Sequence, residues 1–215
     1  MFRSISSRPL AATVRSTLLL PTMSQVRSSS SLPVAPPGTF DPEQFPARRA
    51  DALEFARAHG YWQDCLVEIP VEWGAQDPNN HVNNAVYLRW LESGRLNAIR
   101  TLSNALPEAQ AKDLRGSGKG KGVILARLTY DYLRTTHHPD TVLVLHKVSS
   151  VSSRKMIMEH AIYSYEQASL VGKGECVLVA YDYDKLKSTE WPSEVRRLVE
   201  ARGAKSVDSA PASKL

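Results

Sequence analysis

The segment 77–102 reads DPNNHVNNAVYLRWLESGRLNAIRTL, and it joins a polar turn to an apolar helical pattern. From Asn84 onward, apolar or small residues recur at intervals of three and four, which is the spacing of one face of an α-helix. These positions are Tyr87, Trp90, Leu91, Gly94, Ala98 and Leu102. The charged residues expected on the opposite side are Arg89, Glu92, Arg95 and Arg100. The pattern predicts a long helix, 84–102, that buries its stripe against a larger apolar surface.

Four strand-like segments follow this helix. Each is rich in Val, Ile, Leu, Tyr or Thr, and the short turns between them favour antiparallel pairing of consecutive strands. The segments are Val123–Leu133, Thr141–Ser150, Lys155–Tyr165 and Leu170–Tyr183. A further strand, 66–73, precedes the helix, and its Pro70 favours an edge position because proline cannot donate a hydrogen bond. We expect an α+β fold in which about five or six antiparallel strands wrap the helix.

The regions that flank this block are expected to be short or disordered. Residues 1–45 are rich in Ser, Pro and Arg, which predicts a targeting segment followed by a linker. Short helices are expected at 45–60 and 191–201, where apolar residues return at helical spacing. The expected folded domain therefore covers residues 46–203, and residues 204–215 are expected to form a disordered tail.

Charge and cysteine content exclude several classes of protein. The net charge is +5, but four of the arginines lie in residues 1–40, which contain no acidic residue. Residues 41–215 are therefore nearly neutral and give no reason to expect a nucleic-acid partner. No apolar run approaches the roughly 20 residues that a membrane span needs. Cys65 and Cys176 fit no metal-binding spacing. We expect two reduced thiols, and no metal or other cofactor.

Both ends of the chain are similar to targeting signals. Residues 1–32 are Arg-spaced, Ser-rich and free of acid, as organelle transit peptides are. The terminal Ser213-Lys214-Leu215 matches the tripeptide that directs proteins to peroxisomes. Met23 offers a second start that would remove most of the first signal. We expect a mitochondrial long form, a peroxisomal short form, or both, and the alternatives are a disordered head and a chance match at the tail.

The segment 71–95, VEWGAQDPNNHVNNAVYLRWLESGR, resembles the hot-dog acyl thioesterases. Plant acyl-ACP thioesterases share its Asp-x-Asn-x-His-Val-Asn-Asn run, here 77–84, which leads into a Trp-x-x-Glu-Ser helix, here 90–93. Bacterial 4-hydroxybenzoyl-CoA thioesterase-like proteins are also similar, and the resemblance covers about residues 61–185. This chain departs from many relatives in having Ala75 where they carry an acid, and Asn80 where many bacterial members carry Gly.

The resemblance implies a hot-dog fold, in which a sheet wraps a central helix, and hydrolysis of acyl-CoA or acyl-ACP by a homodimer or homotetramer. The resemblance implies that Asp77 takes part in this reaction, either as the base that activates water or as the nucleophile. His81 could orient or polarise, and Asn79 could hold water or the carbonyl group. If the segment is extended, the spacing of two points these three side chains to one side. A simple turn is the alternative, because Asp, Pro and Asn are common turn formers.

The start of the helix offers the remaining chemistry. Asn83 is the expected cap, and the first amides of the helix, near Asn84, would favour a developing oxyanion. Tyr87 lies one turn further along. Some hot-dog thioesterases use a helix Glu, which would be Glu92 here, although a surface pair with Arg95 explains it equally well.

Basic side chains are candidates for the phosphates of coenzyme A. They are Arg154 and Lys155 in a tight turn, Arg134 near a strand end, and Lys119 and Lys121 in a Gly-rich loop that lacks a P-loop motif. A solvated turn is the alternative at each position. His137 and His138 precede a proline and are expected to be solvated. Two other functions stay open: a non-catalytic hot-dog module that binds acyl chains or acts as a scaffold, and a thioester hydratase on the same fold.

Overall fold

The computed structural model describes residues 41–207. The transit-like residues 1–32 and the terminal Ser213-Lys214-Leu215 lie outside the described residues, so both targeting signals stay predictions. Within 41–207, every helix is too short or too polar to cross a bilayer. Both cysteines are buried free thiols, as the sequence predicts.

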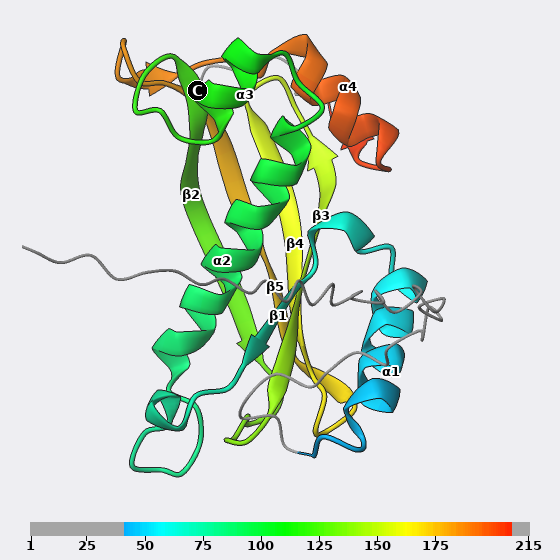
Figure 1. The fold of residues 1–215 in the computed structure, drawn as a ribbon. Helices are drawn as coiled ribbons and strands as arrows, with labels where there is room; N and C mark the ends of the chain where they lie inside the picture. Colours follow the sequence, from blue (N-terminus) through cyan, green and yellow to red (C-terminus); the bar gives the residue numbers. More distant parts are fainter. Residues whose placement is uncertain (1–40, 208–215) are drawn as a thin grey trace, which may run out of the picture. The chain divides into compact units, whose positions relative to one another are not determined.

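Four helices and seven strands make up the described part of the chain (Figure 1). The helices are α1 (Phe45–Ala58), α2 (Asn84–Ser103), α3 (Glu108–Leu114) and α4 (Ser193–Ala201). The main strands are β1 (Val67–Pro70), β2 (Lys121–Tyr132), β3 (Thr141–Val151), β4 (Lys155–Ser164) and β5 (Ser169–Asp182). The two-residue strands are β6 (Lys187–Ser188) and β7 (Lys205–Ser206), and two 3-10 helices, η1 (Gln63–Cys65) and η2 (Trp73–Ala75), flank β1.

The strands form one sheet in the order β1-β3-β4-β5-β2, and every pair on this path is antiparallel. β6 pairs with the end of β5 in antiparallel orientation, and β7 pairs with β3 in parallel orientation. Figure 1 shows α2 lying along the curved strands, which is the arrangement that the resemblance to the hot-dog fold implies. Pro70 ends the edge strand β1, as predicted. No sequence pattern indicated α3, β6 or β7, and β7 lies beyond the expected domain boundary at residue 203.

The sheet is covered on both faces, and β3 shows this most clearly. Val142, Val144 and Val148 belong to the clusters that pack against α2. The alternate residues Leu143 and Leu145 pack with α1 instead. Successive side chains of a strand point to opposite faces, so a strand covered on both sides is apolar throughout. This is why β3 has no alternation of apolar and polar residues in its first half.

A row of polar side chains crosses the α2-facing side of the sheet. His146 on β3 lies opposite His160 on β4, His160 lies opposite Gly174 on β5, and Gly174 lies opposite Tyr130 on β2. His146 is 0% exposed and His160 is 1% exposed. We call these residues the polar row. It lies where the core under α2 divides into two apolar clusters, one towards each end of the helix.

The helix lies very close to the polar row at Gly94. A Cβ atom on Gly94 would lie 2.5 Å from Cε1 of His146 and 2.7 Å from Cγ1 of Val144. The whole stripe that the sequence predicts is buried, from Tyr87 to Leu102. One expectation is wrong: Arg95 does not face solvent but is only 8% exposed, because the helix sinks far enough at Gly94 to cover the neighbouring residue.

Gly94→Ala is expected to destabilise the protein by about 1–3 kcal/mol, because the added methyl group overpacks a filled core. In an exposed helix interior the same change would stabilise by about 1 kcal/mol. Chemical denaturation of the two proteins measures the difference. Ser93→Ala, at the exposed neighbouring position, is the matched control and should change stability by less than about 0.5 kcal/mol. A stabilised Gly94→Ala protein would contradict the close packing.

Acid is expected to destabilise the protein through the polar row. Burial lowers the pKa of His160 to about 4, and burial lowers the pKa of His146 well below its ordinary value. An unfolded histidine binds its proton near pH 6.5, so between pH 6.5 and 4 the unfolded chain binds more protons than the native one. The contribution of His160 to stability is therefore complete above about pH 6.5 and decreases as the pH falls towards 4.

The measurement is the unfolding free energy of wild type and His160→Gln across this range. The unfolding free energy of wild type minus that of His160→Gln should fall by about 3 kcal/mol as the pH is lowered from 6.5 to 4. The comparison also removes the opposing effect of Asp140, whose pKa burial raises to about 6 and whose contribution falls as the pH rises from about 4 to 6. Parallel curves for the two proteins would show that His160 does not titrate differently in the native state.

Candidate active site

The loop between η2 and α2 is a closed turn rather than the extended segment that the sequence spacing suggests. Gln76 and Val82 pair as an isolated β-bridge, and the Asp77 amide donates to the His81 carbonyl at 2.9 Å. The Asp77 carboxylate accepts from the Asn79 amide at 2.8 Å, and Asn80 adopts a left-handed conformation with φ of 60°. The turn brings Asp77 and His81 together at its base and leaves Asn79 exposed at its tip.

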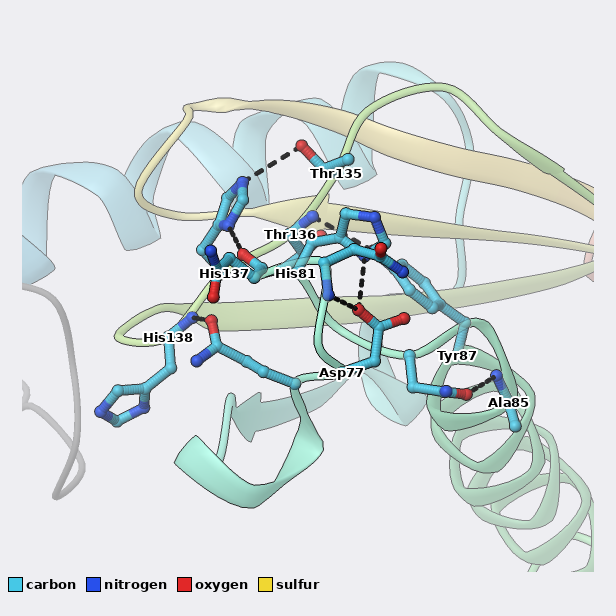
Figure 2. Close-up of polar contacts among 12 residues, drawn as sticks. Asp77, His81, Ala85, Tyr87, Thr135, Thr136, His137 and His138 are labelled. Atoms are coloured by element: carbon cyan, nitrogen blue, oxygen red, sulfur yellow. Dashed lines mark hydrogen bonds and ion pairs between the residues drawn. The ribbon is translucent and has the colours of Figure 1, made fainter.

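Asp77 and His81 face one cavity of about 410 Å³ at the start of α2. Oδ1 of Asp77 lies 3.7 Å from Nδ1 of His81, and Figure 2 shows the carboxylate and the imidazole ring facing each other. The Asp77 side chain is 16% exposed and that of His81 is 34% exposed, so both remain within reach of a ligand. The other residues that line the cavity are Val82, Asn84, Tyr87, Tyr132, Leu133, Arg134 and Thr135.

The first turn of α2 forms one side of this cavity. Asn83 caps the helix as predicted, because its Oδ1 accepts from the Ala85 amide at 2.9 Å. The Val86 amide donates to the Asn83 carbonyl at 2.9 Å. The Ala85 and Val86 amides of the first turn are thus bonded. The Asn84 N–H of the same turn has no hydrogen-bond acceptor among residues 41–207. It is therefore the backbone donor that is free to bind an oxygen atom of a ligand.

The loop after β2, residues 133–140, packs directly on the turn. The Val82 amide donates to the Thr136 carbonyl at 2.8 Å, and the Thr136 amide donates to the Tyr87 hydroxyl at 3.2 Å. The Tyr132 hydroxyl donates to the Asn84 carbonyl at 3.1 Å. Burial raises the pKa of Tyr87 and of Tyr132, so both phenols stay protonated at neutral pH. The two tyrosines thus hold the helix start and shape the cavity without carrying charge.

His137 is exposed, as predicted, and His138 is half-buried; both also form hydrogen bonds that hold this loop. Nδ1 of His137 lies 2.6 Å from the Asn80 carbonyl, which can only accept, so His137 donates there. Its Nε2 then accepts from the Thr135 hydroxyl at 3.1 Å. His138 contacts the Val71 carbonyl through Nδ1 at 2.8 Å. Figure 2 shows the contacts of His137 and the hydrogen bond from the His138 amide to Gln76, which join the two loops.

Asp140 anchors the far end of the same loop from the interior. Its carboxylate is fully buried and accepts from the Thr141 and Glu166 amides at 2.6 and 2.9 Å. The Ser164 hydroxyl donates to it at 2.5 Å. Burial raises the pKa of Asp140 to about 6 although these hydrogen bonds act in the opposite direction. The loop is therefore fixed at both ends, which holds the cavity wall in place.

Several residues proposed from the sequence lie away from this cavity within one chain. Arg154 and Lys155 lie at the start of β4, and the cavity lies near its other end; ten residues of strand span about 33 Å. Lys119 and Lys121 lie at the start of β2, whereas Tyr132 at its end lines the cavity. Glu92 is exposed and makes no ion pair with Arg95. Among the proposed basic residues, the structure brings Arg134 to the cavity wall.

Tyr132, Leu133 and Thr135 line the cavity although sequence reasoning did not single them out. Their only signal is position, because they lie at the end of a strand whose pairing partner was not known. No group of three or more His, Cys, Asp or Glu side chains in residues 41–207 is arranged to hold a metal ion. The groups brought together are a carboxylate, an imidazole, a free helix amide and a guanidinium, and they can bind and polarise an acyl carbonyl group.

Comparison with known proteins finds solved structures of similar fold. The PA2801 protein from Pseudomonas aeruginosa, proposed to be a thioesterase, is 27% identical, with a TM-score of 0.54 over 62% of this chain and 96% of that chain. A thioesterase from Thermus thermophilus, solved with coenzyme A and Zn, is 25% identical, with a TM-score of 0.52 over 67% of this chain and 96% of that chain.

A more distant structure shows the same fold. SAV2348 from Staphylococcus aureus, a hypothetical protein solved with CoA, is 13% identical, with a TM-score of 0.55 over 69% of this chain and 89% of that chain. No curated protein sequence gives a significant match. The family profile of the thioesterase-like superfamily matches residues 71–199, which include the turn, α2 and the four strands β2 to β5. The chain belongs to the thioesterase-like superfamily.

Proposed function

We propose that the protein hydrolyses acyl-CoA thioesters to a free acid and coenzyme A, with Asp77 as the base or the nucleophile. The observation that carries this proposal is the common cavity lined by Asp77, His81 and Asn84, the first residue of α2. Ester and thioester hydrolysis needs a group that activates water or attacks, and a donor for the oxyanion. The cavity offers both.

In the base route, Asp77 accepts a proton from water as the water oxygen bonds to the thioester carbon. The carbonyl oxygen becomes an oxyanion, which accepts a hydrogen bond from the Asn84 N–H at the positive end of the helix dipole. Collapse of this intermediate breaks the C–S bond, and the leaving thiolate takes the proton back from Asp77. His81, 3.7 Å from Asp77, orients the carboxylate or the water.

In the nucleophile route, the Asp77 carboxylate attacks the thioester carbon itself. The thiolate leaves and a mixed anhydride forms, which water then hydrolyses to the free acid and the regenerated carboxylate. The same oxyanion contact serves both steps. Asn79 has no part in either route, because it lies at the exposed tip of the turn.

Coenzyme A is the proposed thiol for two reasons. The Thermus and Staphylococcus proteins of similar fold were solved with CoA, and Arg134 supplies a cation beside the cavity. Acyl-ACP is the second candidate for the thiol.

We also propose a homodimer or homotetramer, supported by exposed apolar side chains on α2 and the edge strand β2, namely Leu88, Leu96 and Leu125. The terminal signals favour mitochondria, peroxisomes or both.

Asp77→Asn is expected to lower kcat/KM for acyl-CoA hydrolysis by about 10²- to 10⁴-fold, because the amide cannot accept a proton or attack. The amide oxygen can still accept from the Asn79 amide, so the turn should persist. Release of free thiol from a series of acyl-CoA chain lengths is the assay. Glu72→Gln is the matched control, since it removes an exposed carboxylate from the same region outside the cavity.

Three results would contradict this proposal. Full activity in the folded Asp77→Asn protein would remove Asp77 from the reaction. A wild-type protein that binds acyl-CoA but hydrolyses none of the series would instead support a non-catalytic acyl-binding module. Hydration of an enoyl-CoA without hydrolysis would point to the hydratase.

Arg134→Met is expected to raise KM for acyl-CoA by about three- to tenfold with little change in kcat, because it removes a charged contact to phosphate. Arg57→Met, which removes an exposed charge from α1 outside the cavity, is the matched control and should leave KM unchanged. The effect should disappear with an acyl N-acetylcysteamine thioester, which has no phosphates. An equal rise in KM for this short thioester would show that Arg134 does not bind the nucleotide part.

A further inference from the structure

The turn 77–82 is attached to the loop 133–140 at its base. The Val82 amide donates to a backbone carbonyl of the loop at 2.8 Å. The His138 amide donates to Oε1 of Gln76, which directly precedes the turn, at 3.1 Å. These two contacts fix where the turn begins and ends, but they do not reach its tip, where the chain reverses direction.

The tip of the turn is held from outside by His137. Its Nδ1 donates to the Asn80 carbonyl at 2.6 Å (Figure 2). Within the described part of the chain, no other side chain from outside the turn forms a hydrogen bond with residues 79–81. The Thr135 hydroxyl fixes the ring from its other side, since it donates to Nε2 at 3.1 Å. The ring is therefore held at both nitrogens although it is exposed.

Asn80 has a backbone conformation that needs such support. Its φ of 60° lies in the left-handed region, which residues other than glycine adopt at a cost in free energy. Conformations of this kind persist where the surrounding structure determines them. From inside the turn, the Asn80 amide donates to the Asp77 carbonyl at 3.0 Å. From outside, the support comes from His137, which binds the carbonyl group of the same residue.

The contact of His137 bears on both candidate reacting groups. The carbonyl that it binds belongs to the peptide group between Asn80 and His81. The preceding residue, Asn79, donates from its amide to Oδ1 of Asp77 at 2.8 Å, so the position of the tip sets the direction of the carboxylate. The same oxygen lies 3.7 Å from Nδ1 of His81. A shift of the tip therefore moves the donor that orients Asp77 and also the backbone that carries His81.

We propose that His137 is a positioning residue for the reaction. By donating to the Asn80 carbonyl, it holds the turn in the form that directs the Asp77 carboxylate into the cavity. His137 does not line the cavity, so it acts through the turn and touches no substrate. Reacting groups must be held within about 0.5 Å, and a displacement of roughly 1 Å can lower a rate by about 10²-fold. The effect on the reaction rests on the proposed function, whereas the support of the turn does not.

Two variants of similar shape isolate the hydrogen bond to Asn80. His137→Asn keeps an amide donor near the place of Nδ1, and His137→Leu has no donor; both lose the contact with Thr135. We expect His137→Leu to lower kcat for acyl-CoA hydrolysis about tenfold and to change KM by less than about twofold, because the turn loosens while the cavity lining stays the same. His137→Asn should keep kcat within about threefold of wild type.

Thermal stability distinguishes positioning from a structural role alone. His137 is exposed, so both variants should fold, and Tm measures this. His59→Leu removes an exposed imidazole that follows α1, and it is the matched control that should leave kcat unchanged. A lower Tm in His137→Leu, with the kcat of wild type per folded molecule, would make His137 a structural contact and overturn the proposal.

A second measurement needs no hydrolysis. Amide hydrogen exchange, followed by NMR, should be faster at Asn79 and Asn80 in His137→Leu than in wild type or His137→Asn, because both amides donate within the turn that loosens. If wild type hydrolyses no acyl-CoA, the proposed function fails, and hydrogen exchange still decides whether His137 holds the turn.

The two measurements together give distinct outcomes. A lower kcat and faster exchange in His137→Leu, with both restored in His137→Asn, support the proposal. Faster exchange with unchanged kcat would show that Asp77 does not depend on the tip of the turn, and it would overturn the positioning role. Equal exchange in all three proteins, or an equal loss of kcat in both variants, would overturn the bond to Asn80 as the basis of that role.

Discussion

The close packing of α2 on β3 at Gly94 is the contact on which the rest of the structure depends. A helix that approaches a sheet this closely buries its whole inner stripe, and it places the first turn of the helix beside the ends of β2 and β5. The turn 77–82 and the loop 133–140 then close around that first turn through backbone hydrogen bonds. The candidate site is therefore a consequence of helix packing, since neither loop has an apolar core of its own.

Those parts of the fold were predictable from the sequence for which a local residue pattern allows few alternative structures. The stripe of α2 has a period of three and four over five turns, and four apolar segments joined by short turns can only pair as an antiparallel sheet. The short elements α3, β6 and β7 carry no such pattern, because their positions are set by contacts with distant parts of the chain. The same reason explains Arg95: by composition it belongs to the exposed side, and only the depth of the helix at Gly94 buries it.

The residues of the candidate site were predictable in part, but its geometry was not. The run 77–84 identified Asp77, His81 and the Asn83 cap, all of which lie at the cavity or support it. The spacing of two suggested an extended segment, but Asp77 bonds to its own turn, as aspartate before proline commonly does, and this removes Asn79 from the cavity. The opposite wall comes from residues 132–135, about fifty positions later, and no local pattern connects the two segments.

The polar row shows why stability alone does not account for this core. Two apolar clusters under α2 would be joined at lower energetic cost by Val or Leu at the positions of His146 and His160, since the histidines make few hydrogen bonds there. Arg95 adds a further cost, because its buried Nη1 has no hydrogen-bond partner among residues 41–207. Tyr130 belongs to this row and also packs against Tyr87 and Tyr132 at the wall of the cavity, so the row and the candidate site share a side chain. The row therefore links the packing under α2 to the aromatic side chains that shape the candidate site.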